Sequence, residues 1–118
     1  MWESAWPLAD TDAVAALYAP EATFFSHPFR AHEPPASYVE WAFGEQSAAE
    51  CRFGQPVVDG DRAAVDWWAV VTDRDGSVQT LAGTSLLRFS RDGLVVEQRD
   101  AWNHMAGRHE LTGWAPVA

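Results

Sequence analysis

The chain has one cysteine, few basic residues and no long apolar run, and each shortage excludes a class of protein. The single cysteine, Cys51, among 118 residues rules out an internal disulfide and favours a reducing compartment. No apolar stretch approaches the ~20 residues that span a bilayer, and the start of the chain lacks the basic and apolar regions of an export signal. We therefore expect a cytoplasmic protein with no membrane partner.

The shortage of positive charge limits the partners further. Eight basic residues stand against 17 acidic ones, which gives a formal net charge of −9. Such a field repels phosphate backbones, so we expect no nucleic acid partner. The sequence also has no glycine-rich phosphate loop, no nucleophile elbow and no metal-ligand spacing among its four histidines. We therefore expect neither a metal nor another cofactor.

Tryptophan, by contrast, is several times more frequent than in ordinary proteins, with seven in 118 residues. Bulky aromatic side chains either fill a core or form the walls of a ligand cavity. The cavity interpretation is strongest for Trp68 and Trp102, because both lie close in sequence to an acidic residue. The length suits one domain, residues 1–118, that buries its own core.

The order of elements predicts an α+β fold. Helices are expected at residues 2–8, 12–18 and 34–43, with a short strand at 22–25 and a loop at 26–30 before the last of them. Long strands follow near residues 50–58, 62–72, 77–89 and 94–104, joined by short Asp/Gly turns. This pattern is typical of an antiparallel meander.

Two acids are expected to lie in one row on this sheet. Pairing across the Asp-Gly turn before residues 94–104 sets Asp100 opposite either Gly83 or Ser85, depending on the loop length. The same arithmetic across the preceding turn sets Asp66 opposite Gly83 or Ser85. Both acids would then flank one small residue, with side chains that could lean toward one ligand or one water.

The neighbours on that face decide between a cavity and a solvated surface. They are Trp68, Val70, Leu87, Val96 and Trp102, which are too apolar for a face left in water. An acid among such residues loses hydration, so its pKa should rise. The alternative is that both acids lie on a solvated face and only keep the sheet in solution.

The strand at residues 62–72 is apolar on both faces, and the predicted helices can cover only one. We therefore predict a homodimer through the outer face of the sheet. The alternative is that residues 105–118 fold back over this face and cover it with Leu111 and Trp114.

Several segments, taken in order, resemble the SnoaL-like branch of the nuclear transport factor 2-like superfamily. They are residues 12–18, ATFF at 22–25, VVDGDRAAVDWW at 57–68, LAGTS at 81–85, LRF at 87–89 and DGLVVEQRDAWN at 92–103. The resemblance covers nearly the whole chain. It implies a cystatin-like cone in which a curved, mainly antiparallel sheet wraps N-terminal helices around a central pocket and dimerises on its outer face.

The resemblance also implies roles for single residues. The acid that SnoaL-type cyclases and epoxide hydrolases carry on the last strand resembles Asp100, and the second acid of the epoxide hydrolases resembles Asp66. Those hydrolases also carry an arginine where this chain has Ala64, which disfavours epoxide hydrolysis. Scytalone dehydratases use paired histidines; here His27 could reach the pocket rim, or be only a turn residue.

The enzyme hypothesis is a cofactor-independent isomerase or cyclase acting on a hydrophobic carbonyl compound. Asp100 would move the proton, with Asp66 and His27 as further catalytic candidates. The candidates for binding the substrate or holding its oxygen are Phe25, Tyr38, Trp68, Ser85, Gln98 and Trp102. The alternatives are a ligand-binding protein without chemistry and a dimerisation or scaffolding domain of the same fold.

Overall fold

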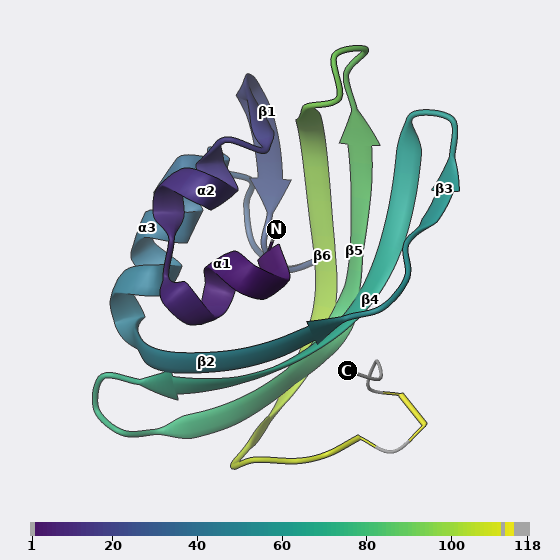
Figure 1. The fold of residues 1–118 in the computed structure, drawn as a ribbon. Helices are drawn as coiled ribbons and strands as arrows, with labels where there is room; N and C mark the ends of the chain where they lie inside the picture. Colours follow the sequence, from purple (N-terminus) through teal and green to yellow (C-terminus); the bar gives the residue numbers. More distant parts are fainter. Residues whose placement is uncertain (1, 112, 115–118) are drawn as a thin grey trace.

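A strongly curled sheet holds short helices in its hollow (Figure 1). The computed structural model describes residues 2–111, 113 and 114. Its elements are α1 (Trp2–Leu8), α2 (Thr11–Ala15), β1 (Tyr18–Phe25), α3 (Pro35–Glu45), β2 (Gln46–Phe53), β3 (Val57–Asp59), β4 (Arg62–Asp73), β5 (Val78–Phe89) and β6 (Val95–Ala106). This confirms the α+β class.

The sheet runs in the order β1-β6-β5-β4-β2, and β3 also pairs with β4. Every pairing is antiparallel except that of β1 with β6, which is parallel. The strands β4, β5 and β6 are the last three of the predicted meander, whereas the strand expected at residues 50–58 is divided between β2 and β3. The helices lie against the concave face of the sheet (Figure 1). Within that hollow Val14, Phe24 and Val39 are fully buried, which anchors α2, β1 and α3 to one another.

The largest difference in secondary structure from the sequence prediction is at the start of the chain. Residues 12–18 were expected to be helical, but α2 ends at Ala15 and β1 begins at Tyr18. Tyr18 pairs with Val95 of β6, and the Val95 amide donates to the Leu17 carbonyl at 2.9 Å. Pairing with a distant strand therefore outweighs the local helical pattern. Pro20 is tolerated because β1 is an edge strand.

One of the two predicted registers between β5 and β6 is confirmed, since Ser85 lies opposite Asp100. The predicted row of acids is wrong, because Asp66 lies opposite Thr84. The turn between β4 and β5 explains the error: the Asp73 amide donates to the Ser77 carbonyl at 2.8 Å and leaves a three-residue loop. A shift of one residue reverses the face of every side chain in a strand.

Asp66 and Trp68 therefore point to the outer face of the sheet, and their odd-numbered neighbours point inward. The Asp66 carboxylate packs over Gly54 of the β2–β3 connection, where an added Cβ would come within 2.1 Å of Asp66 Oδ1. Trp68 keeps no exposed surface at all. Its neighbour Trp67 faces the helices and belongs to the second cluster of buried apolar residues.

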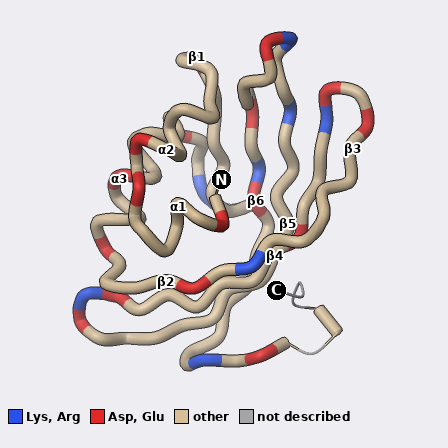
Figure 2. The backbone as a smooth tube through the Cα atoms, viewed as in Figure 1, with Lys and Arg blue, Asp and Glu red and all other residues tan. Residues whose placement is uncertain are grey.

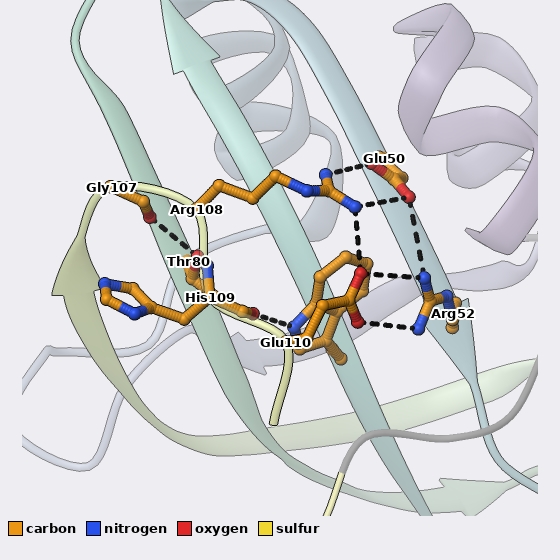
Figure 3. A network of polar contacts seen from close by, with 8 residues as sticks. Glu50, Arg52, Thr80, Gly107, Arg108, His109 and Glu110 are labelled. Atoms are coloured by element: carbon orange, nitrogen blue, oxygen red, sulfur yellow. Dashed lines mark hydrogen bonds and ion pairs between the residues drawn. The ribbon is translucent and has the colours of Figure 1, made fainter. Parts of the chain in front are cut away.

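A segment after β6 covers Trp68. This strap, residues 107–111, runs back across the outer face of the sheet (Figure 3). The Trp68 indole Nε1 donates to the His109 carbonyl at 2.9 Å. Thr80 ties the strap to β5, because its Oγ1 donates to the Gly107 carbonyl at 2.7 Å and accepts from the His109 amide at 2.9 Å.

Charged side chains also lie over the Trp68 ring. Arg52 pairs with Glu50 at 3.7 Å and with Glu110 at 3.2 Å, and Arg108 pairs with the same two acids (Figure 3). Both guanidinium groups lie over the Trp68 ring, with Cζ 4.3 Å from its centroid for Arg52 and 5.4 Å for Arg108.

The strap covers Trp68 on the apolar outer face for which the homodimer was predicted. The alternative prediction, a tail that folds back over the sheet, therefore holds for this part of the face. Its contacts come from Arg108, His109 and Glu110 rather than from Trp114, which is 52% exposed. Residues 112 and 115–118 of the predicted tail lie outside the described residues. No helix in the described part of the chain is long and apolar enough to cross a membrane.

Candidate functional site

The hollow of the sheet contains a cavity of about 170 Å³ between the concave face and the helices. Eight aromatic residues line it: Trp2, Trp6, Tyr38, Trp41, Phe43, Phe53, Trp67 and Trp102. Its other lining residues are Arg30, Ala42, Glu45, Gln46, Val65, Val71, Asp73, Gln79, Leu81, Ser85, Leu87, Gln98 and Asp100. Five of the seven tryptophans of the chain thus face one cavity.

Glycine at position 83 allows Trp102 its place in this wall. Gly83 lies opposite Trp102 in the β5–β6 register. A Cβ on Gly83 would stand 2.2 Å from the Ala101 carbonyl oxygen and 2.5 Å from Trp102 Cβ, closer than real atoms approach. The Trp102 indole Nε1 then donates to the Ser26 carbonyl, which ties β6 to the loop after β1.

Asp100 is the carboxylate of the cavity that the strands hold most firmly. Gln98 Nε2 donates to Asp100 Oδ1 at 2.9 Å. The orientation of the Gln98 amide is fixed from behind: Tyr18 accepts a hydrogen bond from Trp2 Nε1 at 3.1 Å, so the Tyr18 hydroxyl donates to Gln98 Oε1. The Gln98 oxygen therefore faces Tyr18 and its NH₂ group faces the carboxylate.

A second indole fixes the other donor in the same way. Trp67 Nε1 donates to Ser85 Oγ at 3.0 Å, which leaves the Ser85 hydroxyl proton to bond Asp100. Two neutral donors, each oriented by a tryptophan, thus hold one carboxylate on β6. Such preorganisation is what a proton-transferring or ligand-orienting group requires.

The environment brings the pKa of Asp100 close to neutrality. Burial desolvates the carboxylate and raises its pKa from 3.8 to about 6, although the hydrogen bonds from Gln98 and Ser85 act in the opposite direction. The residue as a whole is partly exposed, as expected for a side chain in a cavity wall, while the carboxyl group is surrounded by protein. Asp100 can therefore both accept and return a proton near pH 6.

Tyr38 brings a hydroxyl group to the same cavity from α3. Its ring stacks on Phe24 with centroids 4.7 Å apart. Burial, together with the charge of Asp100, raises the pKa of Tyr38 to about 12, so the hydroxyl stays protonated at neutral pH. No described residue takes a hydrogen bond from it, so it is available to a ligand. The larger increase in the pKa of Tyr18 has the same first cause.

The loop after β1 borders the Trp102 side of the cavity. The His27 ring meets Trp102 edge to face with centroids 4.9 Å apart, and His27 Nδ1 accepts from the Phe29 amide at 3.2 Å. Arg30, which does line the cavity, lies with Cζ 5.4 Å from the Trp102 centroid and donates to Ser26 Oγ at 3.2 Å. His27 therefore supports a wall residue from outside the lining.

The structure brings some of the predicted site residues together and separates others. Tyr38, Ser85, Gln98, Asp100 and Trp102 line the cavity. Asp66 and Trp68 lie on the outer face, and Phe25 pairs with Arg99 and turns outward, whereas Phe24 points inward. Within the described part of the chain, no group of three or more His, Cys, Asp or Glu side chains could hold a metal ion.

The residues that sequence reasoning missed are the supports of Asp100: Trp2, Tyr18 and Trp67. Trp67 follows from the corrected register, since it is the odd-numbered member of the Trp67-Trp68 pair. Tyr18 was placed in a helix. No sequence signal connects it with Gln98, 80 residues away.

The model of the SnoaL-like domain family matches residues 1–98 of the chain. The chain belongs to the SnoaL-like family. This confirms the resemblance on which the predicted fold depended. The match ends two residues before Asp100, so the family assignment covers the helices and most of the sheet but not the acid of the cavity. No curated protein is similar enough to match this SnoaL-like chain.

Solved structures agree with this fold. A nuclear transport factor 2-like protein of unknown function from an Exiguobacterium species is 19% identical, with a TM-score of 0.74 over 86% of this chain and 94% of that one. SalBIII, an epoxide hydrolase/cyclase-like enzyme in pyran ring formation of salinomycin, is 15% identical, with a TM-score of 0.74 over 86% of this chain and 84% of SalBIII.

A third structure is a hypothetical protein from Catenulispora acidiphila with a ketosteroid isomerase-like fold, solved with trimethylamine. It is 17% identical, with a TM-score of 0.71 over 84% of this chain and 79% of that one. At these identities the likeness shows the fold alone, and it confirms the cone-shaped, nuclear transport factor 2-like architecture.

Proposed function

We propose that this SnoaL-like protein binds a hydrophobic carbonyl compound in its aromatic cavity and moves a proton on it, with Asp100 as the base. One observation carries the proposal: a desolvated carboxylate lies in the cavity wall, held by two oriented neutral donors and without an ion-pair partner among the described residues. A perturbed acid in a cleft of this kind is a common mark of a functional site.

The proposed steps need only residues already in the cavity. Asp100 removes a proton from a carbon next to the carbonyl group, and the Tyr38 hydroxyl donates to the oxygen on which negative charge develops. Return of the proton to another carbon gives isomerisation. Attack of the carbanion on a second carbonyl carbon converts that C=O group into an alkoxide, which takes the proton back from Asp100 and completes an aldol-type ring closure. His27 and Asp66 have no direct part in these steps, because neither lines the cavity.

The cavity also limits the ligand. Its volume of about 170 Å³ is slightly larger than the ~150 Å³ apolar cavities that accept benzene. The enclosed part of the ligand is therefore about one or two rings in size.

The second candidate is a ligand-binding protein of the same fold without chemistry. One observation favours it: Ser85 and Gln98, both predicted to donate to the substrate oxygen, donate to Asp100 instead. Tyr38 is then left as the donor for the ligand. The fold alone does not choose between the two candidates. The predicted homodimer and cytoplasmic location stay predictions; an outer-face dimer would use exposed apolar side chains such as Leu86 and Met105, which are 42% and 60% exposed.

The test is exchange of carbon-bound hydrogen on a small bicyclic ketone, 2-tetralone, followed by NMR in D₂O. The wild type should accelerate exchange, Asp100→Asn should reduce the acceleration by about 10²-fold or more, and Tyr38→Phe should reduce it less. The matched control is Asp66→Asn, which alters an acid on the same sheet but on its outer face. Retained exchange in Asp100→Asn would remove the proposed base, and binding without any exchange in the wild type would favour the second candidate.

A further inference from the structure

We propose that the ligand of this cavity carries a positive charge, as a tertiary or quaternary ammonium group on an apolar body, and that this charge pairs with Asp100 inside the aromatic wall. The inference rests on the proposed function only in that the cavity binds a small molecule. It does not depend on whether proton transfer occurs.

The first step is the missing counter-charge. The donors that hold Asp100, Gln98 and Ser85, are both neutral. The basic residue of the lining, Arg30, is committed elsewhere: it lies over Trp102 and donates to Ser26 Oγ. A desolvated carboxylate without a cation is costly, and either a proton or a cationic ligand removes that cost.

The second step is the aromatic wall. A cation over an indole face gains energy from the ring quadrupole, and more so when water is excluded. This chain already uses that contact on the outer face, where Arg52 and Arg108 lie over Trp68. Of the cavity tryptophans, only Trp102 has a cation among the described residues, namely Arg30. The other four cavity tryptophans pack against neighbouring aromatic rings, and the part of each ring that lines the cavity is the surface left for a ligand cation.

The third step is the sign of the surroundings. The lining holds three carboxylates, of Glu45, Asp73 and Asp100, and one guanidinium, of Arg30. Basic residues are few and scattered singly over the chain (Figure 2), whose formal net charge is −9. This field concentrates cations near the mouth and repels carboxylate or phosphate ligands. The Arg74 guanidinium, which donates through Nε to the Gly44 carbonyl, lies close to Glu45 and offsets part of this charge.

The probes are two molecules of nearly the same shape, phenyltrimethylammonium and the neutral tert-butylbenzene. Binding is followed by tryptophan fluorescence, which reports on the cavity because five of the seven tryptophans line it. The neutral probe has the greater intrinsic hydrophobic drive, so the useful quantity is the ratio of the two affinities in each variant. At pH 7.5 we expect Asp100→Asn to lower the preference for the cation about tenfold or more, with Asp66→Asn unchanged.

The pH dependence gives a second readout that a merely structural role of Asp100 would not produce. Cation binding should weaken as Asp100 becomes protonated at acidic pH, and the neutral probe should show no such loss. The other charged or titratable groups facing Asp100 and Trp102 are Tyr18, Tyr38, Arg30, His27 and His104. Asp100→Asn retains all of them, so subtracting its profile isolates the carboxylate.

An unchanged preference in Asp100→Asn would overturn the cationic ligand while leaving the proposed proton transfer intact. Failure of phenyltrimethylammonium to bind the wild type would overturn it as well, and the 2-tetralone exchange assay would then decide the proposed function separately. Circular dichroism of each variant shows whether it has kept its fold.

Discussion

The two faces of β4 each bury a tryptophan, but the charged groups around the two indoles differ. Trp68, on the outer face, is covered by two guanidinium groups whose charges are matched by Glu50 and Glu110. Trp67, one residue earlier, orients the hydroxyl that bonds a carboxylate without a matching cation. The charges over Trp68 are thus paired within the chain, whereas the carboxylate bonded to Ser85 has no ion-pair partner among the described residues. A carboxylate without a paired cation in a cavity can bind a ligand or a proton.

The largest effect should come from truncating the two indoles separately. Trp68→Ala removes a fully buried side chain from beneath the strap, so unfolding free energy should fall by about 3–5 kcal/mol, with probe binding intact in the fraction that stays folded. Trp67→Ala should cost less stability, since it enlarges an existing cavity, but should weaken probe binding more. Urea denaturation and probe titration measure both. Equal loss of binding in the two variants would show that the faces are not independent.

The second effect concerns pH. The folded-state pKa of Asp100 is raised from 3.8 to about 6, so the folded chain binds this proton more tightly than the unfolded chain. The preference of the folded state for the unionised acid lowers the unfolding free energy by at most about 3 kcal/mol. This destabilisation is fully present above pH 6 and disappears as the pH falls toward 4. Asp100→Asn should therefore be more stable than wild type at pH 8, and the difference should shrink on acidification.

Unfolding free energies of wild type and Asp100→Asn across pH 4–8 give that difference free of the other titrating groups. A constant difference would mean that the carboxyl group is solvated. Salt should leave the result nearly unchanged, because the group is buried and has no ion-pair partner among the described residues.

The smallest effect on stability should come from the ion pairs on the outer face. Unlike the effect of Asp100, it should depend on salt. The ion pairs of Arg108 with Glu50 and Glu110 are exposed, so salt screens them and Arg108→Gln should change global stability little. The local readout is hydrogen exchange of the His109 amide, which donates to Thr80 Oγ1. Exchange should quicken in high salt and in Arg108→Gln.

The matched control is Arg62→Gln, because Arg62 lies on the same face but pairs with no carboxylate in the described part of the chain. His109 exchange that ignores both salt and Arg108→Gln would show that the hydrogen bonds to Trp68 and Thr80 hold the strap without help from the charges.

Sequence patterns were enough to predict the meander and to limit the partner of Asp100 to Gly83 or Ser85, of which the structure has Ser85. Alternation and turn residues are local signals, and the family resemblance placed them in a cone. The β5–β6 register needed more than the turn, since a bulge between Arg88 and Phe89 shifts the pairing by one residue. That bulge restored the register expected for a tighter loop.

The turn between β4 and β5 had no such correction, and the prediction failed there. Asp75 accepts the Ser77 amide through Oδ1 at 2.8 Å, and Gly76 adopts a positive φ of 88°, which together set a three-residue loop. The pattern Asp-Arg-Asp-Gly is compatible with several loop lengths, and one residue decides which face Asp66 occupies. The contact of Tyr18 with Gln98 joins distant segments and leaves no local pattern.

The alternation along β4 has a practical consequence for protein engineering. Odd-numbered positions such as Val65, Trp67 and Val71 contact whatever occupies the cavity, whereas the even-numbered Trp68 contacts the chain's own strap. Randomised libraries aimed at ligand preference can therefore vary Val65 and Val71, keep Trp67 because it orients Ser85, and leave Trp68 in place beneath the strap. A single strand thus interleaves, residue by residue, positions that face the cavity with positions that hold the scaffold.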